Sequence, residues 1–315
     1  MTEDRPVLHI TDDLIDEVIS PGQAQNILRE AFIQYGRGDA AMQARVRTQA
    51  GAVKLSTLGA VIPEQGVVGA KVYTTIEGRF NFVILLFSAR DGRPLATFDA
   101  GALTRVRTAA CSVLAAQALA QPQARTLGLF GAGTQGQEHA AQMAASFGLE
   151  QILVHDPYAP ADTAPRLAER TGVPVRHAPA DDIAASADII VTASRSQLPL
   201  FSGQSLRPGT FVAAIGSSLP NTRELDDHAL ARAQAVVVEW KQQTLAEAGD
   251  LVQADPGVLA NGKIVELADV LAGKLRRQST DEIYVYKSVG VGLEDIALAG
   301  EAYRELARTK GWPPA

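Results

Sequence analysis

"TLGLFGAGTQGQEH", residues 126–139, decides the fold of this chain. Its apolar first residues are typical of a short buried strand, and three glycines follow at Gly131, Gly133 and Gly136. A strand, a tight glycine turn and a helix in this order direct the first backbone N–H groups of the helix at an anion. The stretch therefore predicts a dinucleotide-binding turn, and we expect the three glycines to contact the nucleotide.

Strands and helices alternate downstream of this turn. The predicted strands lie at 152–158, 174–178, 188–194, 210–216 and 235–240, and the predicted helices at 135–147, 161–171 and 180–187. Several of the strands are continuously apolar, which is typical of a sheet covered on both faces. The alternation predicts an α/β fold with a Rossmann-type, doubly wound parallel sheet.

An acidic residue follows the second strand of this region. Asp156 lies 25 residues after Gly131, where a carboxylate can accept hydrogen bonds from both ribose hydroxyls of an adenosine. Its charge opposes a 2′-phosphate, and Pro157 and Tyr158 follow it in place of an arginine. The sequence therefore favours NAD(H) over NADP(H) as cofactor. A simpler interpretation, in which Asp156 only begins a turn before Pro157, is weaker beside the glycine loop.

About 125 residues precede the glycine turn, and they have an α+β pattern. Two amphipathic helices are predicted at 10–20 and 23–38, and a helix rich in alanine at 103–120. Between them lie the strand-like runs ARVRTQ, AVKLSTLGAVIP, GVVGAKVYTT and FVILLFSARDGRPLATFDAG, separated by turn signals. This section is too short to cover both faces of its own sheet, so we expect a homodimer that buries apolar strands between subunits.

The composition excludes several classes of protein. The 315 residues are 46% hydrophobic, with a net charge of −6 and a pI near 5.5, which suits two domains and argues against a nucleic-acid partner. No long apolar run predicts a membrane span, and the acidic start MTEDRPVLHI is not typical of a signal peptide. The single cysteine, Cys111, indicates a reducing cytoplasm. The five scattered histidines predict no metal site.

Three cations interrupt the first section. Arg47 lies in a run of small and polar residues, Lys71 lies in an apolar strand, and Arg107 lies on the helix before the nucleotide-binding region. Guanidinium groups bind carboxylates in a bidentate manner, so two arginines and a lysine suit a small acidic substrate. Judged by spacing alone, each of the three is better explained as a solvated surface charge.

The helix sequence LTRVRTAACS resembles the L-T-x-x-R-T-A-A-x-S signature of the ornithine cyclodeaminase/mu-crystallin family. The resemblance covers almost the whole chain, since GAKVYTT, LLFSARDGRPLA, FVAAIGSSLPNTRELD and STDEIYVYKSVGVGLEDIA follow in the family's order. It implies a dimer of two-domain subunits. Residues 1–118 and 287–315 would form the substrate-binding and dimerisation domain, and residues 119–286 the dinucleotide-binding domain.

The resemblance also implies roles for individual residues. Arg47 and Arg107 would bind the substrate carboxylate, with Lys71 beside the substrate nitrogen or carboxylate as a catalytic group. The implied cofactor contacts, besides the glycines and Asp156, are Thr134, Gln135, Thr192, the strand end at 212–215 with Ile215, and Ser288 and Val289 beside the nicotinamide.

Two segments depart from the family pattern. The pocket loop reads EGRFNF at 77–82, which leaves the substrate open. Ornithine cyclodeaminases carry an aspartate in a G-x-D-x-P motif, where this chain has Ser218, as imine-reducing members do; a plain loop serine is the alternative. A cyclodeaminase needs a carboxylate to move protons, whereas a ketimine reductase needs only hydride transfer to a bound cyclic imine.

The resemblance therefore favours reduction of a cyclic imino acid with NAD(H), with Lys71 and Ser218 as catalytic residues. Three alternatives remain open. They are ornithine cyclodeaminase, which converts L-ornithine to L-proline and ammonia; an amino-acid dehydrogenase of the same family; and a ligand-binding member without catalysis.

Overall fold

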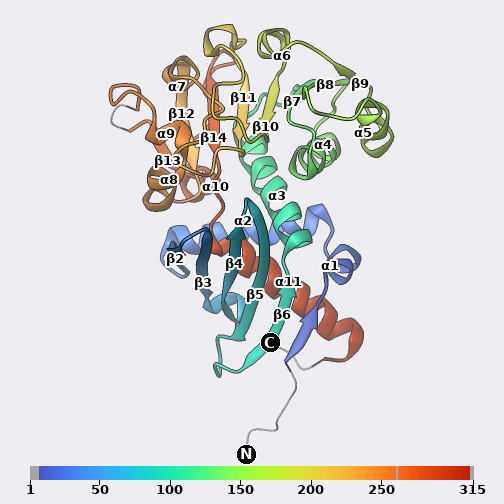
Figure 1. Cartoon of the computed structure of the whole chain (residues 1–315), viewed down its shortest axis with the longest axis vertical. Helices are drawn as coiled ribbons and strands as arrows, with labels where there is room; N and C mark the ends of the chain where they lie inside the picture. The colour runs from blue at the N-terminus through green and yellow to red at the C-terminus, as the bar shows by residue number, and fades with distance from the viewer. Residues whose placement is uncertain (1–6, 260–261, 313–315) are drawn as a thin grey trace, which may run out of the picture. The chain divides into compact units, whose positions relative to one another are not determined.

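A computed structural model describes residues 7–259 and 262–312 of the chain (Figure 1). The chain forms two compact units, the first from Met1–Arg107 with Val291–Ala315 and the second from Thr108–Gly290. The first residues of the chain, on which the expectation of no signal peptide partly rests, lie outside the described range. Among the residues that are described, no helix combines the length and the apolar character needed to cross a membrane.

An eight-stranded sheet forms the centre of the second unit, and all of its strands are parallel. The strand order is β13-β12-β14-β11-β10-β7-β8-β9. The strands are β7 Thr126–Phe130, β8 Gln151–His155, β9 Val175–His177, β10 Ile189–Thr192, β11 Phe211–Ala214, β12 Ala233–Val238, β13 Ile264–Glu266 and β14 Ile283–Lys287. The order β9-β8-β7-β10-β11 is that of a doubly wound dinucleotide-binding sheet, so the predicted fold class is confirmed.

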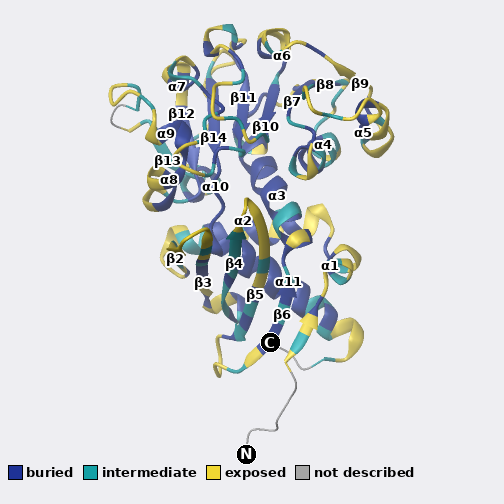
Figure 2. Cartoon of the chain, in the orientation of Figure 1, coloured by how far each residue is buried: buried dark blue, intermediate teal, exposed yellow. Residues whose placement is uncertain are grey.

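Helices connect these strands. They are α4 Thr134–Ser146, α5 Thr163–Thr171, α6 Ala180–Ser186, α7 Asp227–Arg232, α8 Lys241–Glu247, α9 Gly249–Val252 and α10 Leu267–Leu271, with a short 3-10 turn, η2, at Gly203–Ser205. Figure 2 shows the central strands of this sheet as buried. The strands end one to three residues before the predicted ends, because the residues that follow turn away from the sheet. Strands β13 and β14 were not predicted.

The first unit contains a six-stranded sheet of order β1-β6-β5-β4-β3-β2, antiparallel except for the pair β1–β6. The strands are β1 Leu8–Ile10, β2 Ala41–Ala50, β3 Val53–Ile62, β4 Val67–Ile76, β5 Arg79–Ser88 and β6 Pro94–Asp99. Helices α1 Asp12–Val18, α2 Pro21–Arg37 and α11 Gly292–Lys310 and the 3-10 turn η1 Pro63–Gln65 complete the unit. Helix α3, Gly101–Leu119, begins in the first unit and ends in the second.

The two faces of the six-stranded sheet differ. Helix α11 packs on one face, where Leu58, Lys71 and Ile84 lie in register on β3, β4 and β5 and are buried. Side chains alternate along a strand, so the residues next to Leu58, Lys71 and Ile84 in the sequence point to the opposite face of the sheet. Large apolar side chains on that face are about half exposed. These side chains are Val46, Val53, Leu55, Val61, Ile76 and Val83. One face of this sheet is therefore an apolar surface.

Candidate active site

Four charged side chains form a buried cluster in the first unit. Lys71 comes from the centre of β4, Arg107 from α3, and Glu294 and Asp295 from the first turn of α11. Nζ of Lys71 lies 3.1 Å and Nε of Arg107 3.3 Å from Oδ1 of Asp295, while Nη1 of Arg107 donates to Glu294 over 2.5 Å. All four are nearly inaccessible to solvent, so Lys71 and Arg107 are not the surface charges that spacing alone favoured.

The surroundings of Lys71 lower the pKa of its ammonium group. Burial lowers its pKa from 10.5 to about 8; the carboxylate of Asp295 opposes the shift, and the positive charges of Arg107 and Arg45 add to it. Its ammonium group also donates to Oγ1 of Thr104 over 2.7 Å and lies 4.6 Å from the centre of the Phe82 ring. A lysine with a pKa near 8 can hold or release a proton close to neutral pH.

The third predicted cation lies in a different environment. Arg47 is exposed on β2, opposite Ser56 of β3. Arg45 precedes it at an irregularity in the strand, between Gln43 and Val46, and is the arginine of β2 whose charge acts on Lys71. The structure thus brings Lys71 and Arg107 together, and Arg45, which lies close enough to Arg47 in the sequence to be the alternative carboxylate ligand, is the arginine whose charge acts on Lys71.

The glycine turn follows β7 as predicted. Gly131 has a φ of 88°, and a Cβ there would lie 2.7 Å from the carbonyl oxygen of Ala193. A Cβ on Gly136 would lie 1.9 Å from the carbonyl oxygen of Gly131, so this glycine allows the helix to pack on the turn. A Cβ on Gly133 would meet no atom of the described residues within 4 Å. The open side of the turn therefore lies at Gly133, directly before α4, where Thr134 and Gln135 begin the helix.

The carboxylate of Asp156 is hydrogen-bonded to this turn. Its Oδ2 atom accepts from the backbone N–H of Ala132 over 2.8 Å, and its Oδ1 atom accepts from the N–H of Tyr158 over 2.9 Å. A cavity of about 260 Å³ lies beside it, lined by residues of β8, β9 and the turns that follow them, including His155, Asp156 and Pro179. The carboxylate of Asp156 thus lies at the wall of a cavity beside the glycine turn.

Two buried glutamates hold the remaining predicted cofactor residues. Glu224 accepts from the hydroxyl of Thr192 at 2.8 Å and from the backbone N–H of Ser194 and of Gly216, the residue after Ile215. Burial raises the pKa of Glu224 above its ordinary value. These contacts fix the backbone after β10 and β11, at the edge of the sheet where such folds bind nucleotides.

Glu239 fixes the backbone of the turn after β14 by hydrogen bonds. Its Oε1 atom accepts from the hydroxyl of Ser288 over 2.5 Å, and its carboxylate accepts from the N–H groups of Val289 and Gly290. Nζ of Lys287, directly before this turn, lies 3.0 Å from Oδ2 of Asp250, and both side chains are fully buried. Sequence reasoning missed Glu224, Glu239 and Asp250, because a single acid in a polar loop carries no spacing signal.

Ser218 lies in the loop after β11, half-buried, and its backbone N–H donates to the carbonyl of Gly216 over 3.1 Å. The same loop is held by Ser217, whose hydroxyl donates to the carbonyl of Thr222 over 2.8 Å. Position 218 thus carries a hydroxyl that can donate and accept one proton, and no carboxylate.

The second unit fits a dinucleotide. Its glycine turn has an open side at Gly133, a helix of 13 residues starts there, and a carboxylate lies beside the turn. The residues that would hold the group are those of the turn and the ends of β8, β10, β11 and β14. This fold and these groups define an enzyme of the Rossmann class that uses a dinucleotide.

Comparison with known proteins identifies the family. The ornithine cyclodeaminase/mu-crystallin family matches residues 6–310, and the chain belongs to it. A Delta(1)-pyrroline-2-carboxylate reductase of Bacillus cereus is 36% identical over 254 residues, which cover 78% of this chain and 75% of that protein. The protein is therefore an NAD(P)-dependent oxidoreductase of this family.

Solved structures agree in fold along the whole chain. A probable ornithine cyclodeaminase from Bordetella pertussis Tohama I is 66% identical, with a TM-score of 0.97 and coverage of 98% of this chain and 100% of that one. Delta(1)-pyrroline-2-carboxylate reductase of Thermococcus litoralis, in complex with NADH and L-proline, is 25% identical, with a TM-score of 0.91 and coverage of 96% and 98%. An archaeal alanine dehydrogenase dimer with bound NAD is 26% identical, with a TM-score of 0.89 and coverage of 96% and 97%.

Proposed function

We propose that this enzyme reduces a cyclic imino acid, of which Δ1-pyrroline-2-carboxylate is the first candidate, to the corresponding amino acid with NADH. The observation that carries the proposal is the buried cluster of Lys71, Arg107, Glu294 and Asp295. With Arg45 nearby, these side chains have an excess of one positive charge when all are ionised, which suits a substrate with a single carboxylate.

The residues of the first unit have separate tasks in this reaction. A guanidinium group has five N–H donors, so Arg107 can bind a substrate carboxylate while it contacts Glu294 and Asp295. Lys71, with its pKa near 8, can keep a proton on the imine nitrogen, which makes the imine carbon electrophilic. Arg47 would be a second ligand of the substrate carboxylate, from β2.

The second unit binds the cofactor through the turn at Gly131, Gly133 and Gly136. When bound, the nicotinamide supplies the hydride. Asp156 favours NAD(H), because its charge opposes a 2′-phosphate. Glu224 and Glu239 hold the strand ends that carry Thr192, Ser288 and Val289.

Ornithine cyclodeamination is the second candidate function. The strong likeness to the protein from Bordetella pertussis favours it. Ser218 opposes it, because a hydroxyl is no base at neutral pH and deamination needs a group that accepts a proton and orients the amine. An amino-acid dehydrogenase remains a further alternative, supported by the likeness to the archaeal alanine dehydrogenase.

We also propose that the enzyme is a homodimer that buries the apolar face of the six-stranded sheet. Val46, Leu55 and Val83 on this face are 52%, 46% and 41% exposed in the isolated subunit. A continuous exposed apolar surface marks an interface.

An NADH oxidation screen tests the proposed reaction. The purified enzyme is given NADH with Δ1-pyrroline-2-carboxylate, with Δ1-piperideine-2-carboxylate, or with pyruvate and ammonia, and in parallel NAD⁺ with L-ornithine. We expect turnover of a cyclic imine. Turnover confined to pyruvate and ammonia supports the dehydrogenase, and turnover confined to ornithine supports the cyclodeaminase.

A further inference from the structure

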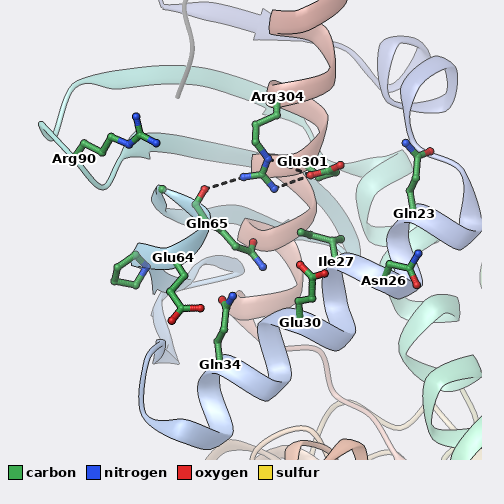
Figure 3. Close-up of a pocket in the computed structure, with 12 residues that line it drawn as sticks. Gln23, Asn26, Ile27, Glu30, Gln34, Glu64, Gln65, Arg90, Glu301 and Arg304 are labelled. Carbon is green, nitrogen blue, oxygen red and sulfur yellow. Dashed lines mark hydrogen bonds and ion pairs between the residues drawn. The ribbon is translucent and has the colours of Figure 1, made fainter.

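The first unit contains a polar cavity that the proposed reaction does not use (Figure 3). Its volume is about 540 Å³, and its walls come from α2, η1, the turn after β5 and α11. Glu30, Gln34, Glu64, Gln65 and Arg90 are among the residues that line it. The cavity is therefore large enough for a small metabolite.

The side chain of Gln65 is buried in this cavity without a partner. Gln65 is 8% exposed, and neither its amide oxygen nor its amide nitrogen has a hydrogen-bond partner among the described residues. Figure 3 shows this amide directed into the cavity toward α2. A buried amide with unmet hydrogen bonds costs free energy, so a site that keeps one is suited to a ligand that both donates and accepts.

The carboxylates of Glu30 and Glu64 add acceptor oxygens to the cavity, beside side-chain amides that both donate and accept. The side chains of Glu30, Glu64 and Gln34 point into the same space as the Gln65 amide (Figure 3). Within residues 7–259 and 262–312, the buried Oε1 atom of Gln34 has no hydrogen-bond partner either. These acceptors call for a ligand with several N–H donors.

The charge of the cavity is negative. The guanidinium group of Arg304 already has partners within the protein, because it donates to Glu301 over 2.7 Å and to the backbone carbonyl of Gln65 over 2.8 Å. Among the lining residues that the structure describes, Glu30 and Glu64 therefore face one remaining cation, Arg90. An excess of carboxylate favours a positively charged ligand.

We propose that this cavity binds a small organic amine that also carries a hydroxyl or carbonyl group. An ammonium group has three donors, which match the carboxylates of Glu30 and Glu64 and the amide oxygens of Gln34 and Gln65. The hydroxyl or carbonyl accepts from Nε2 of Gln65. A neighbouring cavity of about 350 Å³ shares Gln65 and Arg90 with this one and leaves room for the rest of a longer ligand.

Titration calorimetry with 4-amino-1-butanol tests the proposal. This probe has an ammonium group and a hydroxyl group but no carboxylate, so the cluster around Arg107 does not compete for it. We expect saturable binding with a Kd of about 1 mM or tighter and a stoichiometry of one per chain. The uncharged 1,4-butanediol should give no saturable signal.

Two variants and a matched control locate the binding. Gln65→Leu and Glu30→Gln should each raise the Kd about tenfold or more, because each removes one partner of the ligand. Gln65→Leu should unfold at the same temperature as the wild type or higher, since it removes an unpaired buried amide. Glu169→Gln, an exposed glutamate on α5 of the other unit, should bind like the wild type.

Three results would overturn the proposal. They are no saturable binding of the amino alcohol to the wild type, equal binding of the diol, and unchanged binding in Gln65→Leu. None of these measurements depends on turnover of an imino acid, so their outcome is independent of the proposed reaction.

Discussion

Nζ of Lys71 lies 3.1 Å from Oδ1 of Asp295, although 224 residues separate the two along the chain. The contact joins the centre of a strand to the first turn of the last long helix. Burial favours the neutral amine of Lys71, and the carboxylate of Asp295 opposes this by favouring the ammonium form. The result is a pKa of about 8 for Lys71. The pair therefore provides a proton-holding group beside Arg107.

The lowered pKa of Lys71 predicts a pH dependence of stability. Below about pH 8 Lys71 is protonated in both states, whereas between about 8 and 10.5 the unfolded chain binds more protons than the folded chain. The free energy of unfolding should therefore rise with pH across this window, by about 3 kcal/mol from this group. Urea unfolding of wild type and Lys71→Met at several pH values measures it as the difference between the two curves. Parallel curves would show that the shift is absent.

Arg107→Ala should lower kcat/KM for the imino acid strongly. The substrate carboxylate would lose its partner in a buried site, at a cost of about 2–5 kcal/mol. Arg107→Lys should also be poor, since a lysine cannot offer the bidentate fork. Steady-state kinetics on each imino acid measures both variants, and urea unfolding shows whether the unpaired Glu294 destabilises the fold.

Arg105→Ala is the matched control for this prediction. Arg105 lies on the same helix, and it donates to Asp16 at the surface over 2.6 Å. A surface ion pair contributes little, so this variant should keep the wild-type kinetics. Equal kinetics for Arg107→Ala and Arg105→Ala would remove Arg107 from the site.

Local rules of sequence predicted the fold class of the second unit and most strands of its sheet, but not β13 and β14. The glycine turn, Asp156 and the strand ends each depend on a few neighbouring residues, and parallel strands bring their carboxyl ends to one edge. The carboxylates that complete the sites were missed for a physical reason. Glu294 meets Arg107 across 187 residues, and an acid in the first turn of a helix is ordinary, because it interacts well with the helix dipole. Only the tertiary fold distinguishes such an acid from a surface residue.

Asp156→Ser should narrow the preference for NADH over NADPH. The carboxylate opposes a 2′-phosphate, and removing its charge should improve the NADPH to NADH ratio of kcat/KM by about tenfold, or 1.4 kcal/mol. The comparison needs a constant ionic strength. Asp181→Ser, an exposed acid in the first turn of α6, should leave the ratio unchanged. A wild type that prefers NADPH would contradict the role of Asp156.

The dimer proposal predicts that a charge on the apolar sheet face separates the subunits. Leu55→Asp should shift the sedimentation coefficient from that of a dimer to that of a monomer, because an unpaired carboxylate is costly to bury in an interface. Leu198→Asp is the control, since Leu198 is 73% exposed and lies in the second unit. A wild type that stays monomeric at every concentration would rule out the interface.

Ser218 separates the two candidate reactions. With a hydroxyl in place of a carboxylate, the wild type should release ammonia from L-ornithine and NAD⁺ very slowly or not at all, and it should still reduce a preformed cyclic imine. That reduction needs only a bound carboxylate, a proton on the imine nitrogen and the hydride.

The sign of the effect of Ser218→Asp depends on which end of the substrate lies near residue 218. A new carboxylate about 4 Å from the substrate carboxylate repels it by roughly 4 kcal/mol at an effective dielectric constant near 20, and it attracts the side-chain ammonium group of ornithine to a similar extent. The prediction therefore concerns the wild type, with ammonia measured by a coupled assay and proline by chromatography. Efficient conversion of ornithine to proline by the unmodified enzyme would establish the cyclodeaminase in place of the reductase.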